Sequence, residues 1–228
     1  VTHPDSGEPM SRYYYTPRTS EDLLKRHDLM VTATRLGNGI IPFTKDIGAD
    51  AMNAVSITAK VMGKKEYMER AEKFRAYLQK NDLSMAGAMT DVKGNRRLRP
   101  SDKGQAHPDY YVHVVEKNDE GIIVRGAKVH ITAAAYCNEL LVMPSRNMTE
   151  EDADYAVSFA VPANAKGVKH ICHLIRAGLG AHDFPVGVSP RGHTESLIIF
   201  DDVFVPWERV FMCGEWEYSM HLVYNFAY

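Results

Sequence analysis

Apolar residues recur with the period of an α-helix along the N-terminal part of the chain. The pattern is clearest where Tyr67, Ala71, Phe74 and Leu78 share one face and charged side chains occupy the opposite one. Three segments of this kind are predicted to be helices: Thr19–Leu36, Ile47–Met62 and Lys64–Lys80. The first begins with a hydroxyl and an acid in the spacing of a capping box. Residues 1–87 are therefore predicted to form a helical domain that begins with an extended arm over residues 1–18.

From Met89 onward the apolar period changes to two, as in half-buried strands. Six segments are predicted to be strands: Tyr110–Glu116, Ile122–Gly126, Glu139–Pro144, Tyr155–Val161, Val168–Ile175 and Ser196–Val205. Short strands at this spacing favour an antiparallel barrel or sandwich over residues 88–213. Residues 214–228 begin a further amphipathic helix. The predicted fold class is α+β.

Composition adds bounds to this picture. The chain has 228 residues, 45% hydrophobic and 25% charged, as expected for a soluble globular protein with a substantial core. The formal net charge of −2 gives no electrostatic reason to expect nucleic acid as a partner. No apolar run approaches the roughly 18 residues of a membrane span, and no signal peptide is visible. The first residue is not Met, which suggests a piece of a longer chain.

The three cysteines, Cys137, Cys172 and Cys213, are widely spaced and odd in number. This pattern argues against a disulfide framework and indicates a reducing compartment, so a cytoplasmic location is predicted.

The stretch from Ala88 to Thr132 joins the helical part to the strands, and it contains a basic turn, Lys93-Gly94-Asn95-Arg96-Arg97. This turn is either an exposed charged loop or a loop that contacts an anionic ligand through Lys93, Arg96 and backbone N–H groups. Neither alternative is excluded by the residues themselves.

Other candidate motifs are weaker. Gly63-Lys64-Lys65 lacks the upstream glycine of a P-loop, and Gly178-Leu179-Gly180 lacks the strand and third glycine of a dinucleotide fingerprint. His170-Ile171-Cys172-His173 offers metal-competent side chains, but no second ligand pair follows, so no metal site is predicted. Glu195 stands at the start of a predicted strand, either as a general base or as a solvated turn residue. On these patterns alone, the chain is an α+β protein with an anion-binding loop.

Several strings, taken in order, resemble the flavin-dependent 4-hydroxyphenylacetate 3-hydroxylase family. They are Met89–Arg96, Val114–Lys117, Asp119–Lys128 and Phe200–Trp207. Within that family the chain is most similar to the branch of 4-hydroxybutyryl-CoA dehydratases and vinylacetyl-CoA Δ-isomerases. The strings that support this branch are Asp50–Ala54, Leu98–Ser101 and Asp154–Ala160.

The resemblance implies an acyl-CoA-dehydrogenase-like architecture with N-terminal helices, a middle β domain and a C-terminal helical bundle, of which this chain contains at most the beginning. It implies FAD between the β domain and that bundle, and a homotetramer. The residues implied to border the flavin are Met89, Thr90, Lys93, Arg96, Lys128 and Thr132. Glu195 matches a position that would serve the substrate, and it is the candidate catalytic carboxylate.

The chain also departs from both branches. The dehydratases hold a [4Fe-4S] cluster through two cysteines four residues apart, and Pro42 and Asp46 occupy the matching positions. Proline has no ligand atom and iron–sulfur clusters are normally held by thiolates, so no cluster is expected. Residues 40–54 also lack the Arg-x-Pro-Asp-Tyr string of the hydroxylases.

The leading hypothesis is a FAD-dependent enzyme that acts on an acyl-CoA-type substrate by dehydratase- or isomerase-like redox chemistry. The first alternative is a two-component aromatic monooxygenase that acts on a phenolic substrate and receives reduced FAD from a flavin reductase. The second alternative is a non-catalytic flavin-binding or assembly subunit.

Overall fold

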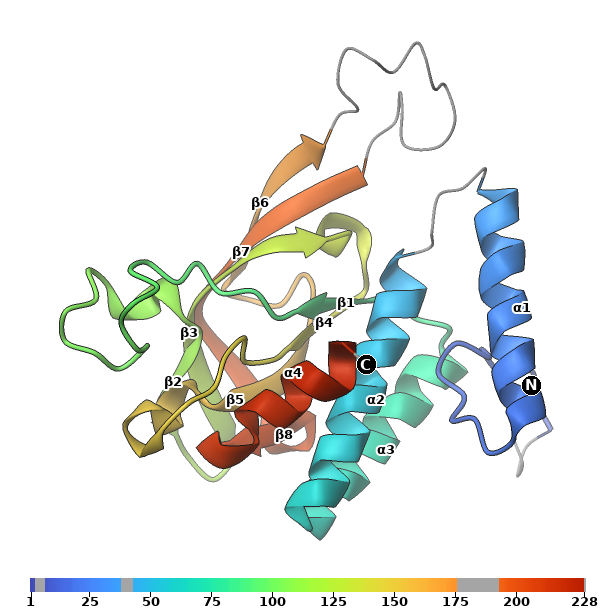
Figure 1. The fold of residues 1–228 in the computed structure, drawn as a ribbon, viewed down its shortest axis with the longest axis horizontal. Helices are drawn as coiled ribbons and strands as arrows, with labels where there is room; N and C mark the ends of the chain where they lie inside the picture. Colours follow the sequence, from blue (N-terminus) through green and yellow to red (C-terminus); the bar gives the residue numbers. More distant parts are fainter. Residues whose placement is uncertain (3–6, 38–42, 176–192, 228) are drawn as a thin grey trace.

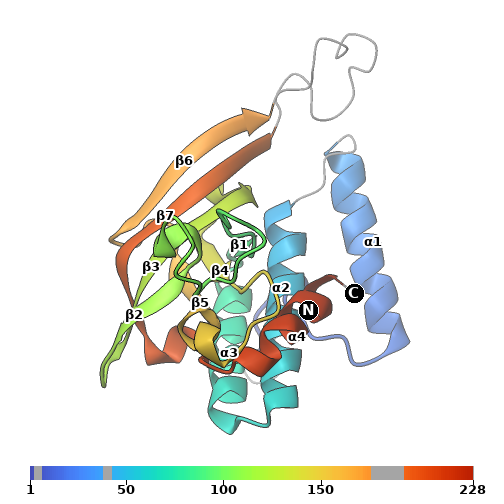
Figure 2. The ribbon, with the colours of Figure 1, turned by 60° about the vertical axis from the view of Figure 1, so that its left-hand side comes forward.

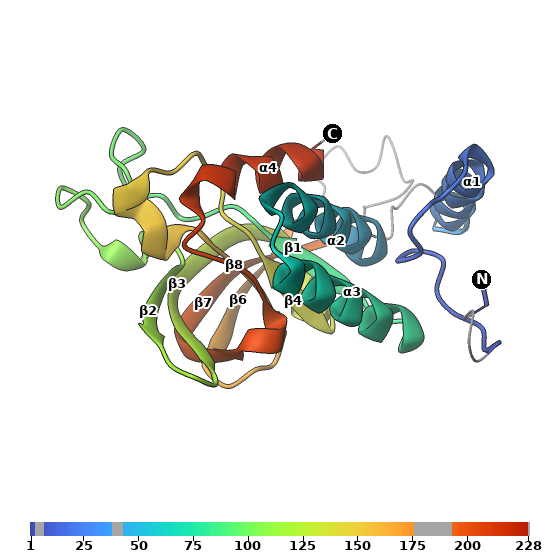
Figure 3. The same cartoon turned by 90° about the horizontal axis from the view of Figure 1, so that it is seen from below.

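The computed structural model describes residues 1–2, 7–37, 43–175 and 193–227, and they form three layers (Figure 1). One layer is helical, with α1 (Ser20–Leu36), α2 (Phe43–Met62), α3 (Lys65–Lys80) and α4 (Ser219–Ala227). The second and third layers are four-stranded sheets. Figure 3 shows α2, α3 and α4 together on one side of the sheets.

The middle sheet has the order β1-β4-β5-β8, with bounds Met85–Ala88, Glu139–Val142, Val157–Pro162 and Val210–Cys213. In it β1 runs parallel to β4, and the other neighbours are antiparallel. The outer sheet is entirely antiparallel and has the order β2-β3-β7-β6, with bounds His113–Lys117, Gly121–Thr132, His193–Pro206 and Val168–Ile175. The long strands β3 and β7 form its centre (Figure 2).

The burial pattern of the strands follows from this layering. All four residues of β4 are buried, because the middle sheet has a core on each face, and such strands read as continuous apolar runs. In β3 buried and half-buried residues largely alternate, because only one face of the outer sheet meets the core. Between the sheets, the rings of Phe159 and Phe200 meet edge to face with centroids 5.8 Å apart.

The second core lies between the middle sheet and the helices. Met52 of α2, Leu78 of α3 and Leu222 of α4 are buried in it together with Leu141 and Phe211. By contrast, α1 has no buried residue. It contacts the rest of the molecule through Arg26, whose Nη2 lies 2.6 Å from Oδ1 of Asp50. The α1 helix is therefore attached at the surface and contributes little to the core.

The predicted helices are confirmed, with α2 beginning four residues earlier than expected. The capping box of α1 is present, since Thr19 accepts from the N–H of Asp22 and the Asp22 carboxylate accepts from the N–H of Thr19. All six predicted strands are present as well, and β3 extends beyond its expected end to Thr132. The sequence did not reveal β1 and β8.

Of the expected antiparallel barrel or sandwich, the barrel is wrong for the described strands, and the fully antiparallel pairing is corrected at one strand. The described strands form two separate sheets and no closed barrel, and one of the sheets is mixed because β1 pairs in parallel with β4. The physical reason is that β1 enters from a helix and joins the edge of the sheet, so no hairpin imposes an antiparallel direction on it. The division into domains at 87/88 and 213/214 stays a prediction, and β1 crosses the first of these positions.

No helix in the described part of the chain is long and apolar enough to cross a membrane.

Candidate functional site

The loop that leaves β1 lies against strand β3, and this contact is the centre of the candidate site. The N–H of Val129 donates to the carbonyl oxygen of Thr90 at 2.8 Å, and Asp91 forms an isolated antiparallel bridge with Lys128. Two segments that the sequence separates by almost forty residues are thereby brought together. The structure thus places Met89 and Thr90 beside Lys128.

Lys128 is buried, with 1% of its surface exposed. Its ammonium group lies 2.7 Å from Oδ1 of Asp91 and donates to the carbonyl oxygens of Met89 and Met143 at 2.9 and 2.7 Å. Burial lowers the pKa of Lys128, and the Asp91 carboxylate opposes that shift. Among the predicted flavin-contacting residues, Lys128 is the one whose polar group is enclosed by protein.

The basic turn is held by the segment that precedes β2. The N–H of Lys93 donates to the carbonyl oxygen of Tyr110 at 3.1 Å, and the N–H of Asn95 donates to Oε1 of Gln105 at 3.2 Å. Lys93 is half-buried, whereas Arg96 is exposed. The turn therefore presents one cation close to the loop after β1 and another to solvent.

Thr132 and Glu195 form the other end of the candidate site. They are register partners on β3 and β7, and the Thr132 hydroxyl donates to Oε1 of Glu195 at 2.7 Å. Glu195 is 9% exposed and is the third residue of β7. The solvated-turn interpretation of Glu195 is therefore wrong, because the carboxylate lies in a strand and is fixed by a hydrogen bond.

Strained backbone gathers in the same stretch. Lys93, His130 and Ala133 have φ values of 75°, 56° and 63°, a conformation that side-chain-bearing residues rarely adopt. His130 lies in the irregularity between Lys128 and Ile131 of β3, and Ala133 directly follows that strand. Strain of this kind persists where the surrounding structure imposes it, and it is common at ligand-binding sites.

The sequence did not place two residues beside Glu195. His173 is the register partner of Glu195 on β6, and Tyr136 follows the end of β3. Burial raises the pKa of Tyr136, with smaller contributions from Cys137 and Glu195. No local pattern could have placed either residue beside Glu195, because His173 approaches it through the pairing of β6 with β7, and Tyr136 through the turn that follows β3.

The described positions that were weighed as metal ligands form no common site. Pro42 lies outside the described residues, and Asp46 stands in the first turn of α2, where burial and the nearby Asp50 raise its pKa. On β6, Nε2 of His170 lies 2.8 Å from the carbonyl oxygen of Ala163, while Cys172 is exposed. Among the described residues, no group of three or more His, Cys, Asp or Glu side chains could hold a metal ion.

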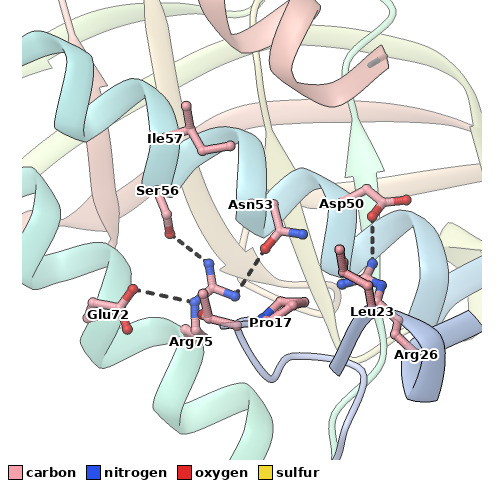
Figure 4. Close-up of a pocket in the computed structure, with 10 residues that line it drawn as sticks. Pro17, Leu23, Arg26, Asp50, Asn53, Ser56, Ile57, Glu72 and Arg75 are labelled. Carbon is pink, nitrogen blue, oxygen red and sulfur yellow. Dashed lines mark hydrogen bonds and ion pairs between the residues drawn. The ribbon is translucent and has the colours of Figure 1, made fainter. Parts of the chain in front are cut away.

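A cavity of about 470 Å³ lies where the N-terminal arm, α1, α2 and α3 meet (Figure 4). The Arg75 guanidinium lies in it and donates to the side chains of Asn53 and Ser56 and to the carbonyl oxygens of Tyr14 and Met52. Glu72 lies 3.5 Å from Nε of the same group. Arg75 thus joins α2, α3 and the arm, and its role at this cavity is structural.

A second cavity, of about 340 Å³, lies on the outer face of the antiparallel sheet. Its walls include Ala127 of β3 and Leu197 and Ile199 of β7, with Tyr110 and Val92 at one side. This cavity borders the segment that leads into the basic turn, since Val92 precedes Lys93 directly.

The chain is similar to known proteins in sequence and in fold. The family profile described as 4-hydroxyphenylacetate 3-hydroxylase N terminal matches residues 1–212. The 4-hydroxybutyryl-CoA dehydratase/vinylacetyl-CoA-Δ-isomerase of Clostridium aminobutyricum is 37% identical over 230 residues, which cover 97% of this chain and 46% of that protein. The chain therefore spans about half the length of the curated relatives it matches.

Two solved structures have the same fold. An oxygen-tolerant archaeal 4-hydroxybutyryl-CoA dehydratase from N. maritimus has a TM-score of 0.82 at 32% identity, covering 97% of this chain and 45% of that one. The oxygenase component of 4-hydroxyphenylacetate 3-monooxygenase, complexed with FAD, also has a TM-score of 0.82, at 29% identity, covering 98% and 46%. By sequence and by fold, this chain belongs to the 4-hydroxyphenylacetate 3-hydroxylase family.

Proposed function

We propose that this chain is the N-terminal and middle part of a flavin-dependent enzyme in which Met89, Thr90, Lys93, Arg96 and Thr132 contact FAD. The observation that supports the proposal is the contact between the loop after β1 and strand β3, which brings Met89 and Thr90 against the strand that also carries Thr132. A relative of the same fold, complexed with FAD, supports the choice of cofactor.

The residues present fit such a group. Lys93, a half-buried residue, and Arg96, an exposed one, offer positive charge to a pyrophosphate. The left-handed backbone at Lys93, His130 and Ala133 is imposed by the surrounding structure, which therefore holds this border in shape before a ligand binds. A binding surface held in advance loses less conformational entropy when a ligand binds.

Flavin, when bound, supplies transfer of a hydride or of single electrons, and the protein supplies orientation and acid–base groups. In this chain the proposed proton-handling group is the Glu195 carboxylate. Thr132 donates to its Oε1 and so fixes its orientation. A largely buried carboxylate, held beside the cofactor border, is suited to take a proton from an activated carbon of an acyl-CoA-type substrate.

Replacement of Glu195 by Gln is expected to lower kcat by a factor of about 10² to 10⁴, the usual contribution of a general acid–base group. Gln keeps the shape and can still accept from Thr132, so FAD affinity is expected to stay within about twofold. Turnover and FAD titration of the full-length protein test this. Glu208→Gln, at an exposed carboxylate in the turn Trp207–Arg209, is the matched control. If Glu195→Gln and Glu208→Gln changed kcat equally, Glu195 would not be the proton-handling group.

The second candidate function is a two-component monooxygenase that hydroxylates a phenol with reduced FAD from a separate reductase. It is favoured by a neighbour, complexed with FAD and 4-hydroxyphenylacetate, with a TM-score of 0.81 at 30% identity. The first candidate function, action on an acyl-CoA-type substrate, is supported by the relatives named as 4-hydroxybutyryl-CoA dehydratases. A homotetramer is part of either proposal.

The two candidates make opposite predictions for the full-length protein under anaerobic conditions. We expect 4-hydroxybutyryl-CoA to change the flavin absorbance without oxygen, and iron to stay below about one atom per subunit, since thiolates are missing at positions 42 and 46. Oxygen-dependent hydroxylation of 4-hydroxyphenylacetate with an added reductase, and no response to the thioester, would establish the monooxygenase instead. A full-length protein that binds no FAD would contradict both.

A further inference from the structure

The buried ion pair between Lys128 and Asp91 is used by none of the steps above. The two side chains are 2% and 3% exposed, and Nζ lies 2.7 Å from Oδ1. A buried pair of charges is often no more stabilising than apolar residues of the same size, because both ions lose their hydration. Its presence in the core calls for a reason other than stability.

The Lys128 ammonium has three hydrogens and three protein acceptors. These are Oδ1 of Asp91 and the carbonyl oxygens of Met89 and Met143, at 2.7, 2.9 and 2.7 Å respectively. An ammonium group can donate three hydrogen bonds, so the protein alone uses all of them. Lys128 is therefore not a direct donor to a ligand at this border.

The Asp91 carboxylate extends the network to two further segments. Its Oδ1 also accepts from the N–H of Val112 at 3.3 Å, and its Oδ2 accepts from the hydroxyl of Ser145 at 2.7 Å. The pair thus ties together the loop after β1, the residue before β2, strand β3 and the segment after β4. All four segments meet at this pair, which directly contacts the carbonyl group of Met89.

We infer that Lys128 and Asp91 are positioning residues for the flavin, which fix the main chain at Met89 and Thr90 without touching the cofactor. The inference rests on the proposed FAD site. Lys128 holds the carbonyl group of Met89, and Asp91 directly follows Thr90, whose own carbonyl oxygen is held by Val129. If the ammonium is removed, this peptide segment loses the bond that sets its orientation, while the rest of the border stays in place.

The test uses the full-length protein and two variants. Lys128→Met removes the charge but leaves Asp91 buried and unpaired, so it is expected to lower Tm. Asp91→Asn/Lys128→Met removes both charges and is expected to recover most of that loss. In both variants we expect the dissociation constant for FAD to rise by at least about tenfold, with a changed visible circular dichroism band of the bound flavin.

Arg125→Gln is the matched control. Arg125 lies on the same strand and pairs with Asp202 at 2.7 Å, but its side chain and that of its partner are 43% and 52% exposed. Its FAD affinity is expected to stay within about twofold of the wild type.

The outcomes separate the two proposals. A double variant that melts close to the wild type and binds FAD with unchanged affinity and spectrum would overturn the positioning role and leave the FAD site intact. If the wild type binds no FAD, the proposed function and this inference both fail. Weakened binding in a folded double variant, with Arg125→Gln unaffected, supports the inference.

Discussion

Replacement of Gly126 by Ala is expected to lower the free energy of unfolding by about 2 to 5 kcal/mol, the sum of left-handed strain and overpacking. Gly126 has a φ of +133°, and a Cβ atom there would lie 2.4 Å from the carbonyl oxygen of Tyr111 and 2.6 Å from Cα of Val112. Both neighbours are backbone atoms, so no side chain can rotate away. Urea denaturation followed by circular dichroism measures the loss.

Gly63→Ala is the control that measures the cost of a positive φ without any steric clash. Gly63 follows α2 with a φ of +69°, and a Cβ atom there meets nothing within 4 Å. Its expected cost is about 1 kcal/mol. If both alanine variants lost the same stability, the close approach of β3 to Tyr111 and Val112 would not be a constraint on this fold.

Replacement of Asp152 by Ala is expected to cost about 3 kcal/mol, because it leaves several partly buried donors without their acceptor. The Asp152 carboxylate is fully buried, and it accepts from the backbone N–H and hydroxyl of Ser101, from the N–H and hydroxyl of Thr149, and from Arg99 at 3.0 Å. It thereby ties the loop before β2 to the turn before β5. Thermal and urea unfolding give the size of the loss.

Asp201→Asn is the matched control, since Asp201 pairs with Lys169 at 2.6 Å in an exposed position. Exposed pairs contribute about 0 to 1 kcal/mol. A loss at Asp201 as large as that at Asp152 would contradict the assignment of the effect to burial.

The pH dependence of the Asp152 variant follows from its pKa. Burial by itself raises the pKa of Asp152, but the hydrogen bonds from Ser101, Thr149 and Arg99 outweigh burial and lower it. A carboxyl whose pKa is lowered on folding stabilises the protein at pH values above its unfolded pKa of about 3.9. That contribution is lost as the pH falls through the folded pKa. The difference between wild type and Asp152→Ala is therefore expected to shrink below about pH 4.

The elements with a clear apolar period were predictable from the sequence. The helix with Tyr67, Ala71 and Phe74 on one face and strand β6 are found within one residue of their expected bounds. Strand β1 was not predictable, because Met85-Ala86-Gly87-Ala88 consists mostly of small residues with low strand propensity. Its extended conformation depends on pairing with β4, which is distant in the chain.

The candidate site was predictable in part. Met89, Thr90 and Lys93 belong to an ordered string that resembles the family, and the structure brings the first two beside Lys128. The enclosure of Lys128 was not predictable, since its partner Asp91 lies far away in the sequence. Lys128 itself stands between the apolar residues Ala127 and Val129, as an exposed lysine of a strand would. Arg99 and Ser101 likewise acquire a role only through Asp152.

The sequence by itself determined the helices, strands β2 to β7 and the family of this protein, because these depend on local periodicity and on ordered strings of residues. The tertiary structure decided the parallel pairing of β1, the burial of Lys128 and the hydrogen bond between Thr132 and Glu195. Each of these joins segments that are remote along the chain. Their geometry depends on sheet register and layer packing, and neither is encoded in any short stretch of residues.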